Sequence, residues 1–134
     1  MVLSCRFKPG FYGRSGRLVK SNSRCRNTAI GAGALVLNTE GIDKTAVGAP
    51  ALLFNSGGDL NTAVGSSALF SNTGGNFNTA VGQVALGNNT TGNYNTAIGH
   101  RALRNNTDGA DNTAIGSGAL DSITSGSRTL RWAC

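Results

Sequence analysis

The sequence has 134 residues, a length at which one domain can bury a sizeable core, but it offers little material for one. Only 6% of the residues are aromatic and 13% are charged, whereas 20 are glycine and 2 are proline. The hydrophobic fraction of 39%, with leucine, isoleucine and valine at fixed places, argues against a disordered linker and favours a repetitive fold ordered by its backbone.

Residues 1–26 form a basic segment that carries seven cations and no acid, whereas residues 27–126 carry three cations and six acids. A basic segment can bind nucleic acid or anionic lipid. No groove-binding motif accompanies this charge, so we favour a solvated arm or cap and expect no specific nucleic-acid binding. No stretch reaches the roughly 20 apolar residues of a membrane span, and the segment lacks the apolar region of a secretory signal.

Residues 27–128 comprise six consecutive units of equal length, which share the pattern N-T-A-[IV]-G-x-x-A-L-x-x-N-T-x-G-x-x. The seventeen-residue period is set by the Thr-Ala dipeptides, which begin at Thr28, Thr45, Thr62, Thr79, Thr96 and Thr113. A fixed period without insertions marks a repeat architecture in which each unit is one supersecondary element. Seventeen residues are too few for a helical hairpin repeat, and glycine, asparagine and threonine disfavour helix interiors.

We predict that each unit is one coil of a parallel β-solenoid, an all-β fold. In the unit 61–77, TAVG forms a short strand with Thr62 and Val64 on one face. The Ala-Leu pair that follows is expected to form a second strand. Asn72 has turn chemistry, and Gly75 is expected to supply a positive φ. The repeated structural positions of this unit are Thr62, Ala63, Val64, Gly65, Ala68, Leu69, Asn72 and Gly75.

Two large apolar side chains per coil, Val64 and Leu69 in the unit 61–77, are expected to point inward. They form a thin core compared with the entropy lost on ordering a whole coil. Ala63 and its counterparts are expected to face outward and to allow another chain to pack closely. We therefore predict self-association, most simply as a homotrimer.

The last six residues, 129–134, abandon the repeat pattern, and we predict that they form a C-terminal cap or tail. Leu130 and Trp132 are the expected capping side chains at this end. At the other end we expect capping by Phe7, Phe11, Tyr12 and Leu18. The three cysteines, Cys5, Cys25 and Cys134, lie outside the regular region, and their odd number and spacing favour free thiols over a disulfide framework or a zinc site.

The NTAIG and NTAVG segments resemble the N-S-V-A-[IL]-G core of the head repeats in YadA-like trimeric autotransporter adhesins. The whole unit, with ALxxNTTGxxNTA, is similar to long arrays in bacterial surface proteins and tail-fibre-like proteins. The resemblance covers residues 27–126. It implies a left-handed parallel β-roll, three chains packed side by side, and a location at the cell surface or in an extracellular fibre. Since the chain as written has neither a stalk nor a membrane barrel, we expect a head module, a fragment or a short stand-alone array.

Positions that vary between units are the candidates for recognition of a matrix protein or glycan: Gln83, Tyr94, His100, Arg101 and Arg104. We expect no enzyme, no cofactor and no metal. His100 is the single histidine and has no nucleophile that can be argued to lie beside it. The six acids form no periodic ladder, and the calcium-binding nonapeptide pattern does not occur.

Two further functions compete with adhesion. The first is a structural spacer that only extends a fibre. The second is an ice-binding solenoid, in which the threonines from Thr28 to Thr113 order water on a flat sheet. The isoleucine or valine that shares their face is expected to be buried, which argues against ice binding. For Phe77 and Tyr94, which precede the next coil at equivalent positions, we favour the core or an interface over stacking on sugars.

Overall fold

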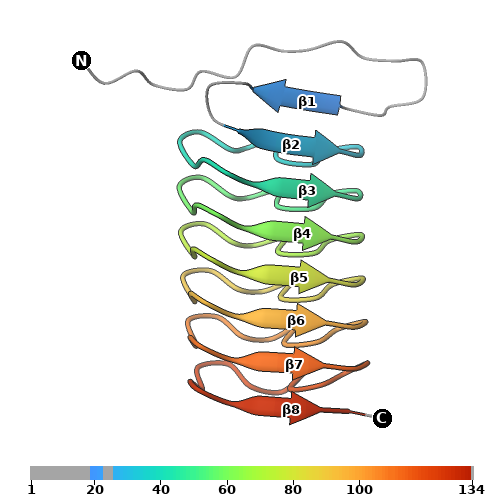
Figure 1. The fold of residues 1–134 in the computed structure, drawn as a ribbon, viewed down its shortest axis with the longest axis vertical. Helices are drawn as coiled ribbons and strands as arrows, with labels where there is room; N and C mark the ends of the chain where they lie inside the picture. Colours follow the sequence, from blue (N-terminus) through green and yellow to red (C-terminus); the bar gives the residue numbers. More distant parts are fainter. Residues whose placement is uncertain (1–18, 23–25, 134) are drawn as a thin grey trace.

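Eight short strands lie side by side in one sheet, in the order in which they occur along the chain (Figure 1). The computed structural model describes residues 19–22 and 26–133. The strands are β1 Val19–Asn22, β2 Asn27–Ile30, β3 Thr45–Val47, β4 Thr62–Val64, β5 Thr79–Val81, β6 Thr96–Ile98, β7 Thr113–Ile115 and β8 Leu130–Trp132. Strands β2 to β8 run parallel, whereas β1 pairs antiparallel with β2. The predicted all-β solenoid of six coils is confirmed.

The register of the sheet equals the period of the sequence. Thr62 pairs with Thr79, so each residue lies beside its counterpart in the next coil. Hydrogen bonds between coils continue outside the strands, where the Leu69 N–H donates to the Ala85 carbonyl at 3.0 Å. Like positions therefore form columns along the solenoid with a spacing of about 4.8 Å. We name each column after its residue in the coil 61–77, so that Tyr94 belongs to the Phe77 column.

The predicted second strand at Ala68 and Leu69 is a turn, so this part of the prediction was wrong. Leu69 has a φ of 49°, and the other leucines of its column also lie in the left-handed region. That conformation is uncommon for a residue with a large side chain. It turns the chain at Leu69 and directs the side chain inward, and residue type alone gives no signal of it.

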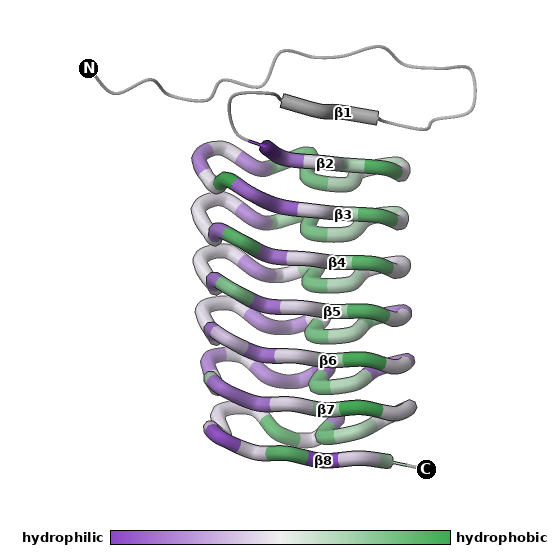
Figure 2. The backbone as a smooth tube through the Cα atoms, in the orientation of Figure 1, coloured by the Kyte–Doolittle hydropathy of each residue, from purple (hydrophilic) through white to green (hydrophobic). Residues whose placement is uncertain are grey.

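The hydrophobic core consists of the Ala63, Ala68 and Leu69 columns, whose side chains are fully buried in the first five coils. The Val64 column, which we expected inside, faces outward, and its members Val81 and Ile98 are 36% and 40% exposed. Figure 2 shows it as a hydrophobic column along the strands β2 to β7. The expected orientation of the strand is therefore reversed.

The reversal follows from the narrow interior of the coil. Two alanines and one leucine share that space with two asparagines, represented by Asn61 and Asn72, which are also fully buried. In so tightly packed an interior, a β-branched side chain in place of Ala63 would overpack the core. The Ala63 column is thus closed to another chain, and the argument for an oligomer that rested on it was wrong.

Two ladders of buried asparagine side chains supply hydrogen bonds where the core is thin. Asn72 donates from Nδ2 to Asn55 Oδ1 at 2.8 Å and to the carbonyl of Gly75 at 2.9 Å. In the second ladder, Asn61 Oδ1 accepts the backbone N–H of Asn78 at 2.9 Å. The chain bends at Thr73 and Gly74, between these two residues. Buried amides that bond to their neighbours in this way hold the coils in one register.

The role predicted for Gly75 was wrong, because its φ does not lie in the left-handed region. A Cβ at this position would overlap Asn72 Oδ1 and the carbonyl oxygen of Gly92. Glycine is therefore required there for space. The positive φ belongs to Gly65, at 137°, and bends the chain at the end of β4.

The C-terminal residues continue the ladder as β8. Leu130 pairs with Thr113 and Trp132 pairs with Ile115, so both side chains belong to outward columns, and they are 64% and 68% exposed. They do not cover the core, and Arg131 occupies the position of the buried alanine. The residues proposed to cap the other end, together with the three cysteines, lie outside the described residues: Phe7, Phe11, Tyr12, Leu18, Cys5, Cys25 and Cys134.

Candidate binding surface

Four of the five candidate ligand residues lie along one edge of the solenoid, where the chain turns after strands β5 and β6. Gln83 and His100 share the Ser66 column and are exposed. Arg101 follows His100, and its N–H donates to the Gln83 carbonyl at 2.9 Å. Arg104 follows three residues later and is brought to Arg101 by a shared carboxylate, as described below.

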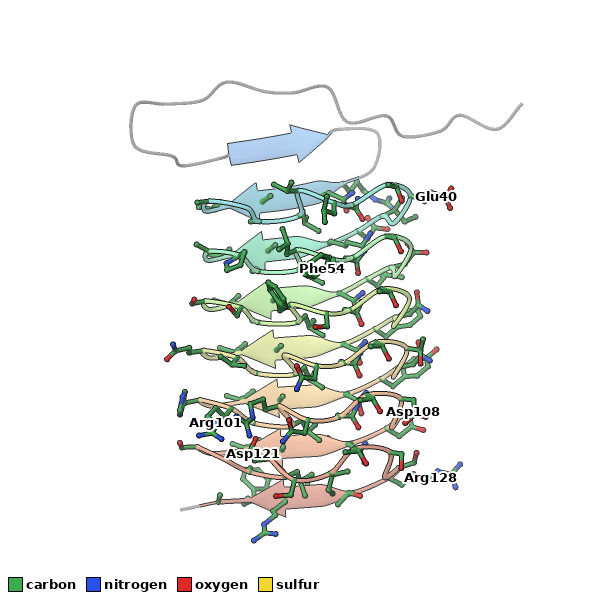
Figure 3. The ribbon with its side chains drawn as sticks, turned by 180° about the vertical axis from the view of Figure 1, so that it is seen from behind. Glu40, Phe54, Arg101, Asp108, Asp121 and Arg128 are labelled. Carbon is green, nitrogen blue, oxygen red and sulfur yellow. The ribbon has the colours of Figure 1, made fainter. Side chains whose placement is uncertain are left out.

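Tyr94, the fifth candidate, lies at the opposite edge. It belongs to the same column as Arg128, and Figure 3 places Arg128 and Arg101 at opposite edges of the coils. Tyr94 and Phe77 stack in parallel, with ring centroids 4.8 Å apart and an interplanar angle of 5°. The two side chains are 57% and 45% exposed, so they are not part of the core of this chain.

Arg101 and Arg104 converge on the carboxylate of Asp121 in the next coil. Arg104 Nε lies 2.8 Å from Asp121 Oδ1, and Arg101 Nη2 lies 3.1 Å from Oδ2. The amide of Asn105 donates to the backbone carbonyl of Asp121 at 2.7 Å. Arg101 Nε is screened from solvent and has no hydrogen-bond partner among the residues that the structure describes. The three side chains remain 41%, 33% and 24% exposed for Arg101, Arg104 and Asp121.

Asp121 was not among the residues predicted from the sequence, although the sequence contains a signal for it. Asp121 follows Arg104 by one period of the repeat, so the two share the Phe70 column and lie in neighbouring coils. Opposite charges about 4.8 Å apart on one face are expected to pair. The period of the repeat, applied to the charged residues, would therefore have found this ion pair.

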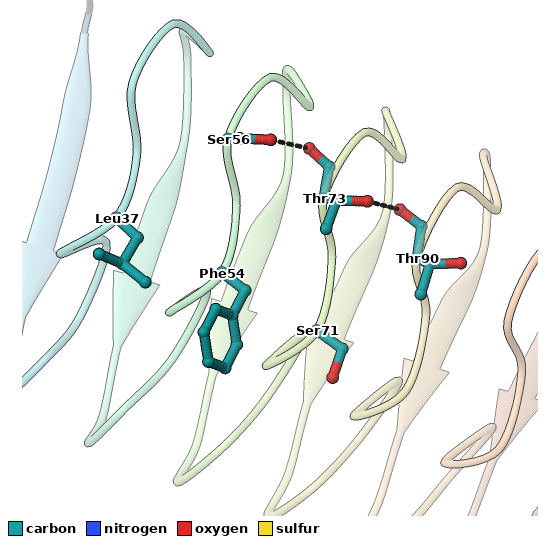
Figure 4. Close-up of a pocket in the computed structure, with 6 residues that line it drawn as sticks. All are labelled: Leu37, Phe54, Ser56, Ser71, Thr73 and Thr90. Carbon is teal, nitrogen blue, oxygen red and sulfur yellow. Dashed lines mark hydrogen bonds between the residues drawn. The ribbon is translucent and has the colours of Figure 1, made fainter.

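A shallow groove of about 510 Å³ opens on another face, across coils one to four (Figure 4). It forms where the Ser71 column changes from the large Leu37 and Phe54 to serine. Phe54 packs edge-on against Phe70 with ring centroids 5.0 Å apart. The lining of the groove is mainly apolar, and the hydroxyl of Thr73 is occupied by its hydrogen bond to the Thr90 carbonyl. Sequence reasoning did not find this groove, which depends on the difference in size between side chains of one column.

Lys44 stands in the buried Asn61 column and is 1% exposed. Its Nζ donates to Asn38 Oδ1 at 2.7 Å. Burial lowers the pKa of Lys44 to about 8, and the carboxylate of Asp59 opposes that shift. The enclosed amine reaches no ligand surface, so we assign it no role in binding.

Within residues 19–22 and 26–133, no group of three or more histidine, cysteine, aspartate or glutamate side chains is placed to hold a metal ion. The same residues include no helix long and apolar enough to cross a membrane. Comparison of the chain with family models, with curated proteins and with solved structures finds no match.

Proposed function

We propose that the chain is a non-enzymatic head module of a cell-surface or extracellular fibre, which binds a matrix protein or glycan through the variable positions of its coils. One observation carries the proposal. Ala63, Ala68 and Leu69, which recur in every coil, are buried, whereas variable residues such as Gln83 and His100 are exposed. A rigid scaffold that displays changing side chains at fixed spacing is suited to recognition.

The proposal includes a left-handed β-roll in which three chains associate side by side. Its support is now the outward Val64 column, because an exposed apolar column of this length favours contact with another chain. We expect sedimentation equilibrium of the full chain at micromolar concentration to give the mass of a trimer. A folded monomer under these conditions would contradict the trimer. It would not affect the proposed binding, which is tested separately.

Binding is tested by passing the full chain over immobilised collagen, immobilised laminin and a glycan array. We expect retention on at least one of these surfaces, and loss of retention when the exposed residues of the Ser66 column are replaced. The matched control carries replacements in the Gly74 column, at the opposite edge, and should still be retained. Absence of retention on all surfaces would support the alternative of a structural spacer.

Ice binding is a second candidate, favoured by the outward orientation of the Val64 column. Each strand of this face presents one threonine and one valine or isoleucine, and these side chains recur at the strand spacing of about 4.8 Å. Charged side chains do not interrupt the Thr62 and Val64 columns from β2 to β7. The sequence argument against ice binding assumed a buried column, and that assumption was wrong.

Thermal hysteresis separates ice binding from adhesion. If the face orders water, the wild-type chain depresses the freezing point below the melting point, and Thr79→Lys abolishes the effect by placing a charge on the face. Thr91→Lys introduces the same charge at an exposed position of the Gly74 column and should retain the activity. A wild-type chain without hysteresis removes this candidate.

A further inference from the structure

The acidic side chains other than Asp121 lie at the edge of the solenoid opposite Arg101 and Arg104. The acids other than Asp121 occupy the Gly74, Asn76 and Phe77 columns: Glu40, Asp43, Asp59, Asp108 and Asp111. Figure 3 shows Glu40 and Asp108 at one edge, and Arg101 with Asp121 at the other. Among the described residues, Asp121 is thus the one acid beside Arg101 and Arg104. Two guanidinium groups and one carboxylate leave an excess of one positive charge at this edge.

Asp121 holds the two arginines in place by accepting one hydrogen bond from each of them. Each guanidinium has five N–H donors, and the carboxylate accepts one from Arg104 and one from Arg101. The other N–H groups of both guanidinium groups have no partner within residues 26–133, and those of the terminal nitrogens are left for a ligand. Side chains that are already ordered lose less entropy on binding, so the pair is preorganised for an oxyanion.

The surroundings of the pair favour a hydroxyl-rich ligand. A line of exposed polar side chains runs beside it along the solenoid axis: Ser66, Gln83, His100 and Ser117. These groups can hydrogen-bond the hydroxyls of an extended sugar chain. Nucleic acids without base pairing bind through aromatic stacking platforms, but the stacked Phe77 and Tyr94 lie at the opposite edge.

We propose that Arg101 and Arg104, bridged by Asp121, form a binding site for an anionic group of an acidic polysaccharide, either a sulfate ester or a carboxylate. Both groups present several oxygens to a guanidinium fork, which binds them in a bidentate manner. The neighbouring sugar hydroxyls contact the Ser66 column. This site deepens the proposed function, because it names the ligand class for one of the variable surfaces.

The test measures the affinity of the full chain for heparin, for hyaluronate, which carries carboxylates alone, and for neutral dextran. We expect binding to at least one of the two anionic polymers and none to dextran. Replacement of both guanidinium groups in R101Q/R104Q should weaken that binding about tenfold or more. The control R128Q/R131Q removes the same charge elsewhere and should change the affinity by about twofold or less, since it removes no direct contact.

A third variant, R101Q/R104Q/D121N, guards against misfolding by removing the carboxylate that would otherwise be left unpaired, and it should also lose binding. Equal losses of polysaccharide affinity in R101Q/R104Q and R128Q/R131Q would overturn the site in favour of general charge attraction. The site would also be overturned if R101Q/R104Q lost affinity for duplex DNA by the same factor as for the anionic polysaccharide. A chain that binds a matrix protein or a neutral glycan but neither anionic polymer would overturn the site and leave the proposed function standing. The proposed function fails separately if the chain also binds no matrix protein and no glycan.

Discussion

Gly82→Ala is expected to destabilise the solenoid by about 3 kcal/mol or more. Gly82 lies at the corner after β5 with a φ of 134°, a conformation that residues with a side chain rarely adopt. A Cβ there would also overlap the carbonyl group of Gly99 in the next coil. That carbonyl belongs to backbone that is hydrogen-bonded between coils, so it cannot move away without disturbing the ladder.

The matched control is Gly74→Ala. Apart from its two chain neighbours, no described residue has an atom within 4 Å of where a Cβ at Gly74 would lie, and its φ is outside the left-handed region. We expect a stability change within about 1 kcal/mol, because alanine restricts the unfolded chain and its methyl group meets no other atom in the folded one. Urea titrations of both variants, followed by far-ultraviolet circular dichroism, measure the difference. Similar midpoints for the two variants would show that close contact between coils does not limit stability.

The seventeen-residue period was sufficient to predict the coils, their number and their register. The orientation of the strand was not predictable in the same way. In T-A-[IV]-G, a period of two defines two faces but does not say which one is buried. Hydrophobicity favours Val64 as the inward residue, whereas the narrow interior accepts only Ala63. The width of that interior depends on Leu69 and on the asparagine ladders, which lie outside the strand in the same coil.

The residues of the candidate surface could be named from the sequence, but their positions around the coil could not. Sequence spacing gives the order of columns around the coil but not the angles of its corners. Those corners lie at residues with positive φ, such as Leu69 and Phe77, whose side chains give no hint of a left-handed conformation. The sequence therefore named Arg101, Arg104 and Tyr94 as variable positions without placing them, and the structure brings the two arginines together and puts Tyr94 at the opposite edge.

Lys44→Asn is expected to stabilise the chain by about 3 kcal/mol at pH 7. Lys44 interrupts the Asn61 column, and its ammonium group provides no acceptor for the backbone N–H of the next coil. In the neighbouring coils, Asn61 Oδ1 accepts that bond from Asn78 and Asn78 Oδ1 accepts it from Asn95. An asparagine at position 44 would restore the bond to Asn61 and remove a buried charge.

The pH dependence of stability tests the same residue, because burial lowers the pKa of Lys44 from 10.5 to about 8 in the folded chain. Below pH 8 the amine is charged in both states, and the folded state bears the full penalty of the buried charge. Between pH 8 and 10.5 the unfolded chain binds more protons, so the free energy of unfolding rises with pH.

Across the same range the penalty of about 3 kcal/mol is progressively lost in the wild type. The difference in unfolding free energy between Lys44→Asn and the wild type should therefore shrink as the pH rises, while titrations of all other groups cancel in that difference. Lys44→Met is the control, because it removes the titrating amine without providing an acceptor for Asn61. It should remove the same slope but gain less stability. If wild type and Lys44→Asn instead give parallel curves from pH 7 to 10.5, the amine does not titrate inside the folded coil.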